Sequence, residues 1–153
     1  MSCITLEGDH QMHKPKWAIG FAVLALAMTG LLTSCGGTLP LDVANLWGTW
    51  RLTGWSDSQG LPSKQITLVV DDTGAHGNST CNAYQSTLTV DSTGTFRVGT
   101  LGTTYVLCQG ATAEAETTYL HLLAAVTKWN TSTKDGPLVL SSNRNELLRF
   151  LRL

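Results

Sequence analysis

The sequence has little charge and no excess of either sign. Only 14% of its residues are charged, and the formal net charge is −1. A nucleic-acid-binding domain usually carries a basic patch or stripe, so we exclude nucleic acid as a partner. Low-complexity tracts, internal repeats and heptad patterns are also missing, which excludes solenoids and coiled coils.

Signatures of catalysis and metal binding are missing as well. The chain contains no G-x-S-x-G motif and no phosphate-binding loop, and His76 and His121 do not stand at a metal-ligand spacing. No C-x-x-C pair supports a zinc or redox site. Asp71 and Asp72 belong to a D-D-T-G turn, so we interpret them as solvated turn residues. We therefore expect no enzyme activity, no metal and no cofactor.

The longest apolar run is too short for a permanent membrane span. Residues 17–32 read WAIGFAVLALAMTGLL, sixteen residues without a charge. As a helix this run would cover about 24 Å, less than the roughly 30 Å hydrocarbon core of a bilayer. The preceding HKPK and the small residues near its end are typical of a secretory signal peptide, which we assign to residues 1–34. Glu7 and Asp9 would dilute the positive start of such a leader, so we predict that translation begins at Met12.

The leader ends in LTSC, residues 32–35, which resembles the lipobox of bacterial lipoproteins. The resemblance implies cleavage before Cys35, attachment of a diacylglycerol to its thiol and acylation of the new amino terminus, with chains such as palmitate. Two or three acyl chains anchor a protein stably. Gly36 in place of aspartate implies the outer membrane, facing the periplasm, if the cell has two membranes. An ordinary secreted protein and an uncleaved anchor are the alternatives to a lipid-anchored envelope protein.

Behind the leader the chain is rich in Thr, Ser and Gly, a composition that favours short strands and tight turns. We expect a tether over residues 35–44 and one folded domain over residues 45–153. Helical spacing predicts a helix over residues 112–129, with Glu114 and Glu116 in its first turn, where the helix dipole favours them. Alternation, β-branched residues and turn signals predict strands at 46–55, 65–70, 85–90, 95–98, 103–108, 138–142 and 146–153.

These elements predict an α+β fold with a mostly antiparallel sheet of six to eight short strands and one packed helix. Three motifs add a family resemblance: W-x-L at Trp50 to Leu52, a Gly77…Cys81-Asn82 motif, and a Thr104…Cys108 motif followed by a helix that opens on Glu116. Thr80 and Val106 stand where the motifs usually have glycine and methionine. This pattern resembles the META domain family, also called HslJ-like. The resemblance implies a curved, partly closed sheet and an envelope protein associated with stress or antibiotic tolerance, without an assigned reaction.

Cys81 and Cys108 are the cysteines that remain besides the lipidated one, and export would place them where disulfides persist. We predict a disulfide between them; two buried thiols are the alternative. Asn82 tolerates left-handed backbone angles, so we interpret it as a structural turn residue, with a ligand contact as the alternative. Gly77 is expected to allow a bulge or a close approach of two backbones.

Alternation along the first strand predicts that Trp50 faces the core and that Trp47 and Trp55 share the opposite face. An exposed aromatic pair can mark a binding surface, although a loop or the helix can also cover it. We therefore expect a lipid-anchored, non-enzymatic, monomeric interaction module with two partners: the membrane, through the lipid on Cys35, and an unknown envelope protein or small ligand. A carrier of a small apolar ligand or lipid is the first alternative, and an enzyme with an unrecognised site is the second.

Overall fold

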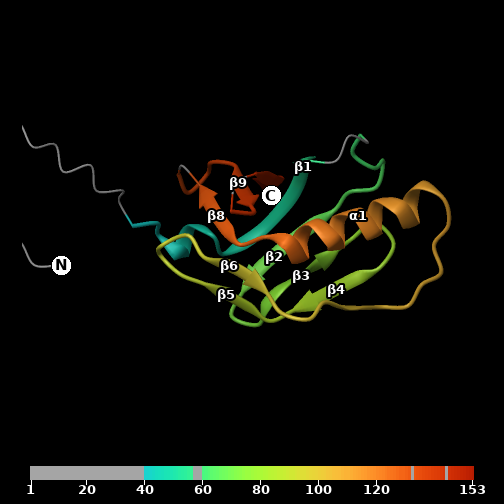
Figure 1. Ribbon diagram of the computed structural model, residues 1–153, viewed down its shortest axis with the longest axis horizontal. Coiled ribbons are helices and arrows are strands. Elements are labelled where there is room, and N and C mark those ends of the chain that lie inside the picture. The colour runs from blue at the N-terminus through green and yellow to red at the C-terminus, as the bar shows by residue number, and fades with distance from the viewer. Residues whose placement is uncertain (1–39, 57–59, 132, 144) are drawn as a thin grey trace, which may run out of the picture. The chain divides into compact units, whose positions relative to one another are not determined.

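The computed structural model describes residues 40–56, 60–131, 133–143 and 145–153, all within one compact unit (Figure 1). The predicted leader, the start at Met12, the lipid site at Cys35 and most of the tether lie outside the described residues. Among the helices of the described part, none has the length and apolar character needed to cross a membrane.

One α-helix, one short 3₁₀ helix and ten strands make up the described part of the chain. In chain order they are η1 (Val43–Asn45), β1 (Gly48–Trp55), β2 (Thr67–Asp71), β3 (Gly74–Asn78), β4 (Ala83–Ser86), β5 (Leu88–Val90), β6 (Phe96–Val98), β7 (Gly102–Thr103), α1 (Ala111–Ala125), β8 (Lys128–Thr131), β9 (Leu138–Ser141) and β10 (Glu146–Arg152).

Eight of the strands form a single antiparallel sheet in the order β7-β4-β3-β2-β1-β10-β9-β8, and β5 and β6 form a separate hairpin. The main sheet has two edges, β7 and β8, and is therefore open. Figure 1 shows α1 lying across this sheet. The fold is α+β, as the pattern of elements predicts.

Alternating side chains of the sheet and one stripe of the helix build the core. Trp50 and Leu52 of β1 point inward, with exposed fractions of 0% and 7%, and Tyr119 and Leu123 of α1 are fully buried. The Trp50 indole also donates a 2.9 Å hydrogen bond to the carbonyl of Leu46. The remaining buried hydrophobic residues are Leu46, Ile66, Leu68, Val70, Ala75, Tyr84, Phe96, Val126, Trp129, Leu138, Leu140, Leu148 and Phe150.

The predicted helix over residues 112–129 is too long at its C-terminal end. The helix stops at Ala125, and Val126 takes an extended conformation with φ −65° and ψ 137°. Lys128–Thr131 instead forms β8, which pairs with β9. Tertiary pairing overrides the helical spacing here, because Trp129 gains a sheet partner and its indole donates to the carbonyl of Asp91.

Two strand predictions also need correction. The segment 85–90 is divided at Thr87 between β4 of the main sheet and β5 of the hairpin. Of the predicted strand 103–108, only Thr103 lies in a strand, because β7 covers Gly102–Thr103. Thr104 still bonds to Ala83 of β4, but the residues after it have no partner strand in the sheet, so their β-branched and aromatic composition does not produce a ladder.

Candidate functional site

The residues of the two cysteine-containing motifs come together at one end of the sheet. They lie on the β3–β4 turn, on the segment that follows β7 and on the first turns of α1. The turn is closed by a 2.9 Å bond from the Ser79 backbone N–H to the carbonyl of Asn82. Thr80 has a φ of 102°, a left-handed angle that favours glycine, and its hydroxyl donates to the carbonyl of Thr112 at 3.0 Å.

Asn82 holds the segment after β7 through its side-chain amide. Its Oδ1 accepts a 2.7 Å bond from the Val106 N–H and a 2.9 Å bond from the Thr104 hydroxyl. Its Nδ2 donates to the Val106 carbonyl at 3.2 Å and to Glu116 Oε1 at 2.8 Å. Both lone pairs and both protons of the amide are therefore in use, which indicates a structural role for this buried side chain.

Glu116 joins the same cluster from α1. Its Oε2 accepts bonds of 2.8 Å from the Asn82 N–H and from the Ser79 hydroxyl. Burial raises the pKa of Glu116, but the hydrogen bonds from Asn82, Ser79 and the Cys81 backbone outweigh burial, and the net pKa lies below its ordinary value of 4.5. Glu116 lies beyond the first turn of the helix, where Glu114 is the acidic residue, so it acts through these bonds rather than through the dipole alone.

The predicted disulfide is confirmed: Cys81 and Cys108 are bonded, with 6.3 Å between their Cα atoms. The bridge ties the β3–β4 turn to the end of the segment that Asn82 holds. Both sulfurs also lie within 4.8 Å of a Glu116 oxygen. Sulfur in a disulfide carries no thiolate charge, so Glu116 is the one anionic ligand that this group offers a metal.

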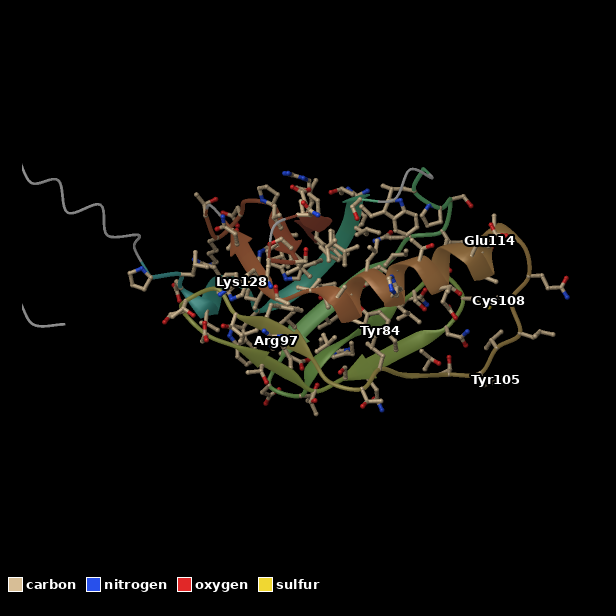
Figure 2. The ribbon with its side chains drawn as sticks, viewed as in Figure 1. Tyr84, Arg97, Tyr105, Cys108, Glu114 and Lys128 are labelled. Atoms are coloured by element: carbon tan, nitrogen blue, oxygen red, sulfur yellow. A yellow bond between two sulfur atoms is a disulfide. The ribbon has the colours of Figure 1, made fainter. Side chains whose placement is uncertain are left out.

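Three apolar side chains are exposed to solvent on the segment between β7 and Cys108. Tyr105, Val106 and Leu107, here called the apolar tip, have exposed fractions of 98%, 58% and 81%. Figure 2 shows Tyr105 on the segment that runs between β7 and α1, directed away from the sheet. Exposed apolar clusters of this kind often mark interaction sites, and here the backbone beneath them is held at Val106 and Cys108.

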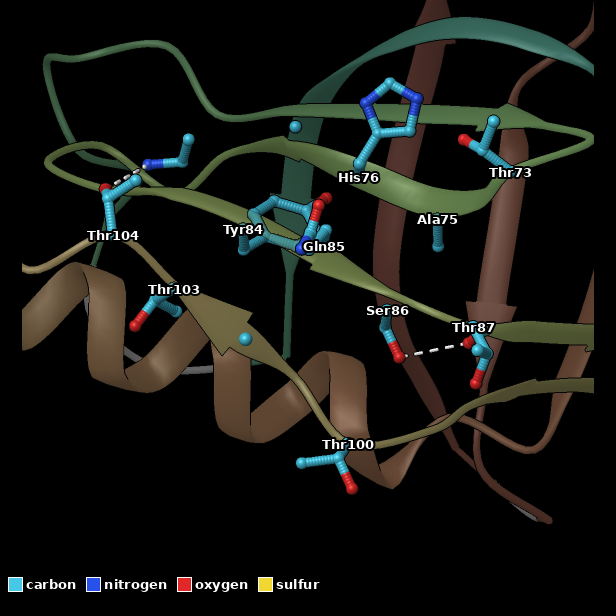
Figure 3. A pocket seen from close by; sticks show the side chains of 13 residues that line it. Thr73, Ala75, His76, Tyr84, Gln85, Ser86, Thr87, Thr100, Thr103 and Thr104 are labelled. Carbon is cyan, nitrogen blue, oxygen red and sulfur yellow. Dashed lines mark hydrogen bonds between the residues drawn. The ribbon is translucent and has the colours of Figure 1, made fainter.

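A groove of about 960 Å³ lies beside the strands that carry this cluster. It runs along β3, β4 and β7, and Figure 3 shows Ser86, Thr100 and Thr103 among its lining side chains. At its inner wall Tyr84 donates or accepts a 2.6 Å bond with the Tyr119 hydroxyl. Burial raises the pKa of both tyrosines, which keeps both hydroxyls neutral. Small and hydroxyl-bearing residues dominate the lining, together with His76 and Gln85.

His76 at the rim of the groove bonds to Asp71 through a 2.9 Å contact between Nε2 and Oδ2. Asp71 also accepts bonds from the N–H and hydroxyl of Thr73, within the predicted turn. Hydrogen bonds from His76 and then from Thr73 lower the pKa of Asp71 to about 2. Both side chains of the pair are more than a third exposed, so we interpret the pair as one that fixes the turn beside the groove.

Comparison with known families decides the identity of the fold. The model of the META domain matches residues 44–153, most of the chain. The chain belongs to the META domain family. A solved structure described as the NMR structure of the protein from Burkholderia xenovorans has 24% identity and a TM-score of 0.58, over 91% of this chain and 98% of that one. At this identity the likeness supports the META fold alone, and no curated protein matches the chain.

The tryptophan surface predicted for this META domain does not form as expected. The pairing of β1 with β10 shifts between Leu52 and Gly54, which is a β-bulge, and places Trp55 opposite the buried Leu148. Strict alternation fails at this bulge, so Trp55 packs against the core on the side of Leu52. Trp47 is 42% exposed and lies just before β1. The two side chains therefore do not share one outer face.

Other motif residues of the META domain lie where a structural role requires them. A Cβ at Gly77 would collide with the carbonyl oxygen of Thr67, so glycine permits the close approach of two neighbouring strands. Thr104 joins the Asn82 cluster through its hydroxyl and donates its N–H to the Ala83 carbonyl. Sequence reasoning missed Ser79, whose role depends on its contact with Glu116. It also missed the apolar tip, because residues 103–108 have the composition of a strand. The one available signal was the run of uncharged residues at 99–113.

Proposed function

We propose that this META domain is the folded part of a lipid-anchored, non-enzymatic protein of the bacterial cell envelope, where it acts as an interaction module. The observation that carries the proposal is the apolar tip: three exposed apolar side chains on a backbone held by Asn82 and a disulfide. A rigid apolar projection loses little conformational freedom on binding. Family membership supports the cell-envelope setting.

The position of the tip within the domain favours a partner away from the anchoring membrane. The described chain begins at one end of the domain, and the segment that carries Tyr105 lies toward the opposite end (Figures 1 and 2). A lipid on Cys35 would be joined to Leu41 by a linker that spans about 20 Å at most. The anchored end would then stay near the bilayer, and the tip would meet proteins of the envelope space.

The cluster around Asn82 supports a structural rather than a catalytic role. Every hydrogen-bonding atom of the Asn82 amide and both oxygens of Glu116 have a partner within the domain. A catalytic acid or base needs an atom within reach of a substrate. The interaction is proposed to serve stress or antibiotic tolerance, which a deletion strain can test by growth in the presence of envelope-active antibiotics.

Site-specific crosslinking in intact cells tests the interaction. A photoreactive amino acid replaces Tyr105 in one strain and Lys128 in a control strain; both residues are exposed, but they lie at opposite ends of the domain (Figure 2). We expect one discrete crosslinked species from position 105 and none of the same mass from position 128. Equal crosslinking from both positions, or none from position 105, would overturn the proposed contact surface.

The groove keeps a carrier function as the second candidate. Its volume of about 960 Å³ lies within the range of small-molecule sites. Most of the groove surface is apolar, but large aliphatic side chains are missing among the lining residues, so a small uncharged ligand is favoured over the acyl chain of a lipid. Native mass spectrometry of the purified full chain tests this candidate, since a carrier would retain a bound molecule that is released when the protein is denatured.

A further inference from the structure

The edge strand β7 offers backbone groups that the sheet itself does not use. Thr104 donates its N–H to the carbonyl of Ala83 at 3.0 Å, and the Ala83 N–H returns a 3.2 Å bond to the Thr104 hydroxyl, so these two residues continue the hydrogen-bonded positions of the ladder by one step. Such pairs alternate, and Thr103 therefore occupies a non-hydrogen-bonded position opposite Tyr84. Its N–H and carbonyl point away from β4, toward the open side of the sheet.

The same alternation continues past the end of β7 because Asn82 replaces the missing strand. The Asn82 amide binds both the N–H and the carbonyl of Val106, the residue two positions beyond Thr104. The backbone of Tyr105, between them, therefore faces outward like that of Thr103. In the described part of the chain the Tyr105 N–H has no hydrogen-bond partner, and the register of β7 on β4 directs the Thr103 N–H away from the ladder.

The opposite edge of the sheet, β8, is covered by other parts of the chain. At β8 the Trp129 N–H donates to the carbonyl of Gly94 at 2.8 Å, and a β-bridge joins Lys128 to Thr95. Thr127, just before β8, also accepts a bond from the Phe96 N–H at 3.1 Å. Natural sheets usually protect an edge by covering it or by placing charges on it. β8 has both devices, whereas β7 and the tip have neither, since residues 99–113 carry no charged side chain.

We propose that the edge from Thr103 to Tyr105 accepts an extended, uncharged segment of another envelope protein as an added β-strand. The inference rests on the proposed interaction function and names its binding mode. Backbone hydrogen bonds to Thr103 and Tyr105 supply the pairing, as in other cases of strand addition. Alternate side chains of the added strand face the groove beside β7, and the apolar tip covers the segment where it passes Leu107.

The chemistry of the surface sets the chemistry of the segment. A charged side chain would lose water at β7 or at the tip without finding an opposite charge, because residues 99–113 contain none; the Asp71–His76 pair at the far rim of the groove is already matched within the domain. Small or polar side chains suit the threonine-lined groove, and apolar side chains suit the tip. A second copy of this chain could pair by the same edge, but so short an edge buries little surface between two folded domains, and stable interfaces usually bury 1,200 Å² or more, as a rough guide. An extended segment can follow the edge without that limit.

The probe is a linear peptide selected from a display library by panning on the full chain, held in detergent micelles. Its affinity is then measured for two variants at one position. Tyr105→Ala removes the aromatic side chain, and Tyr105→Pro removes the outward N–H as well. Neither change removes a hydrogen bond that the domain makes with itself. Strand addition predicts that proline weakens binding by roughly tenfold more than alanine, since a pairing hydrogen bond and its neighbour are lost.

Hydrogen exchange on the unaltered chain gives a second readout if Tyr105→Pro fails to fold. Bound peptide should slow exchange at the outward amides of Thr103 and Tyr105, and it should leave Val106, whose N–H is already bonded to Asn82, nearly unchanged. Equal binding to the proline and alanine variants, or unchanged exchange at both outward amides, would overturn strand addition. Self-association that Tyr105→Pro abolishes would overturn the assignment to a foreign segment.

The two proposals fail in different ways. If crosslinking from position 105 succeeds but the proline and alanine variants bind the peptide equally, the tip is an interaction surface that does not use strand pairing. If position 105 gives no crosslink in cells, the interaction function fails even where a selected peptide binds in solution.

Discussion

At the scale of single residues, the side chain of one asparagine makes the hydrogen bonds that a neighbouring strand would otherwise make. Asn82 binds both backbone groups of Val106 and is itself fixed by Glu116, which lies 34 residues further along the chain. Removing one partner of such a buried cluster leaves the others without hydrogen bonds, which costs more than the bond itself is worth. The stability of this end of the domain therefore depends on a few polar side chains.

We expect Glu116→Gln to lower the free energy of unfolding by about 1 to 3 kcal/mol at neutral pH, because in either orientation the new NH₂ group would face an N–H donor of Asn82, from its backbone or from its side chain. The lowered pKa of Glu116 means that the carboxylate stabilises the fold above its ordinary pKa of 4.5 and that this contribution is lost as the pH falls through the lower folded value. The two proteins should thus converge in acid. Urea unfolding at several pH values measures the difference.

Glu114→Gln is the matched control, because Glu114 is exposed on the same helix and makes no hydrogen bond to the cluster. Its free energy of unfolding should equal that of the unaltered protein to within about 0.5 kcal/mol. A difference between Glu116→Gln and the unaltered chain that persists unchanged into strong acid would contradict the charge-dependent role of Glu116.

Gly77→Ala should destabilise the domain by about 2 to 4 kcal/mol, since the added methyl group collides with the Thr67 backbone between two paired strands. Gly60 has open space around its Cβ position, so Gly60→Ala should be close to neutral. Thermal unfolding followed by circular dichroism compares the two. Equal midpoints would show that β2 and β3 can move apart at no cost.

At the scale of elements, neighbours in space override two local patterns. The alternation of β1 is correct through Leu52 and then fails at the bulge, which places Trp55 on the core side. The helical spacing of α1 is correct through Leu123 and then yields to the pairing of β8. Neither a bulge nor a change from helix to strand follows from periodicity, because both depend on β9 and β10, which come later in the chain.

The disulfide belongs to the same scale, because it joins the β3–β4 turn to the segment ahead of α1. It closes a loop across 27 residues, and the chain-entropy model assigns such a bridge about 3 to 4 kcal/mol. Replacing Cys81 and Cys108 together by serine should lower stability by that amount or somewhat less, since Asn82 still holds Val106.

Guanidinium unfolding of the double variant beside the unaltered chain measures the loss. Alkylation of the denatured, unreduced protein followed by mass spectrometry is the companion experiment. Labelling of both Cys81 and Cys108 without reduction would show that the bridge does not form in cells.

At the scale of the whole molecule, the predicted lipid anchor determines where the domain is held. The lipid anchor at Cys35 remains a prediction from the LTSC pattern, outside the described residues. We expect Cys35→Ser to abolish incorporation of a labelled fatty acid and to shift the protein from the membrane fraction to the soluble envelope fraction or to an uncleaved precursor. Retention of the label in this variant would assign the lipid to another residue.

The sequence by itself determined most of the strands, the body of the helix, the family and the cysteine pair, because these follow from local periodicity, turn chemistry and short motifs; β3 and β8 were missed. The tertiary structure alone decided that Asn82, Glu116 and Ser79 form one cluster and that Tyr105 and Leu107 face solvent. A β-branched and aromatic segment becomes a buried strand only if another strand lies beside it. Here the Asn82 side chain takes that place, so the segment keeps an open edge and an apolar surface.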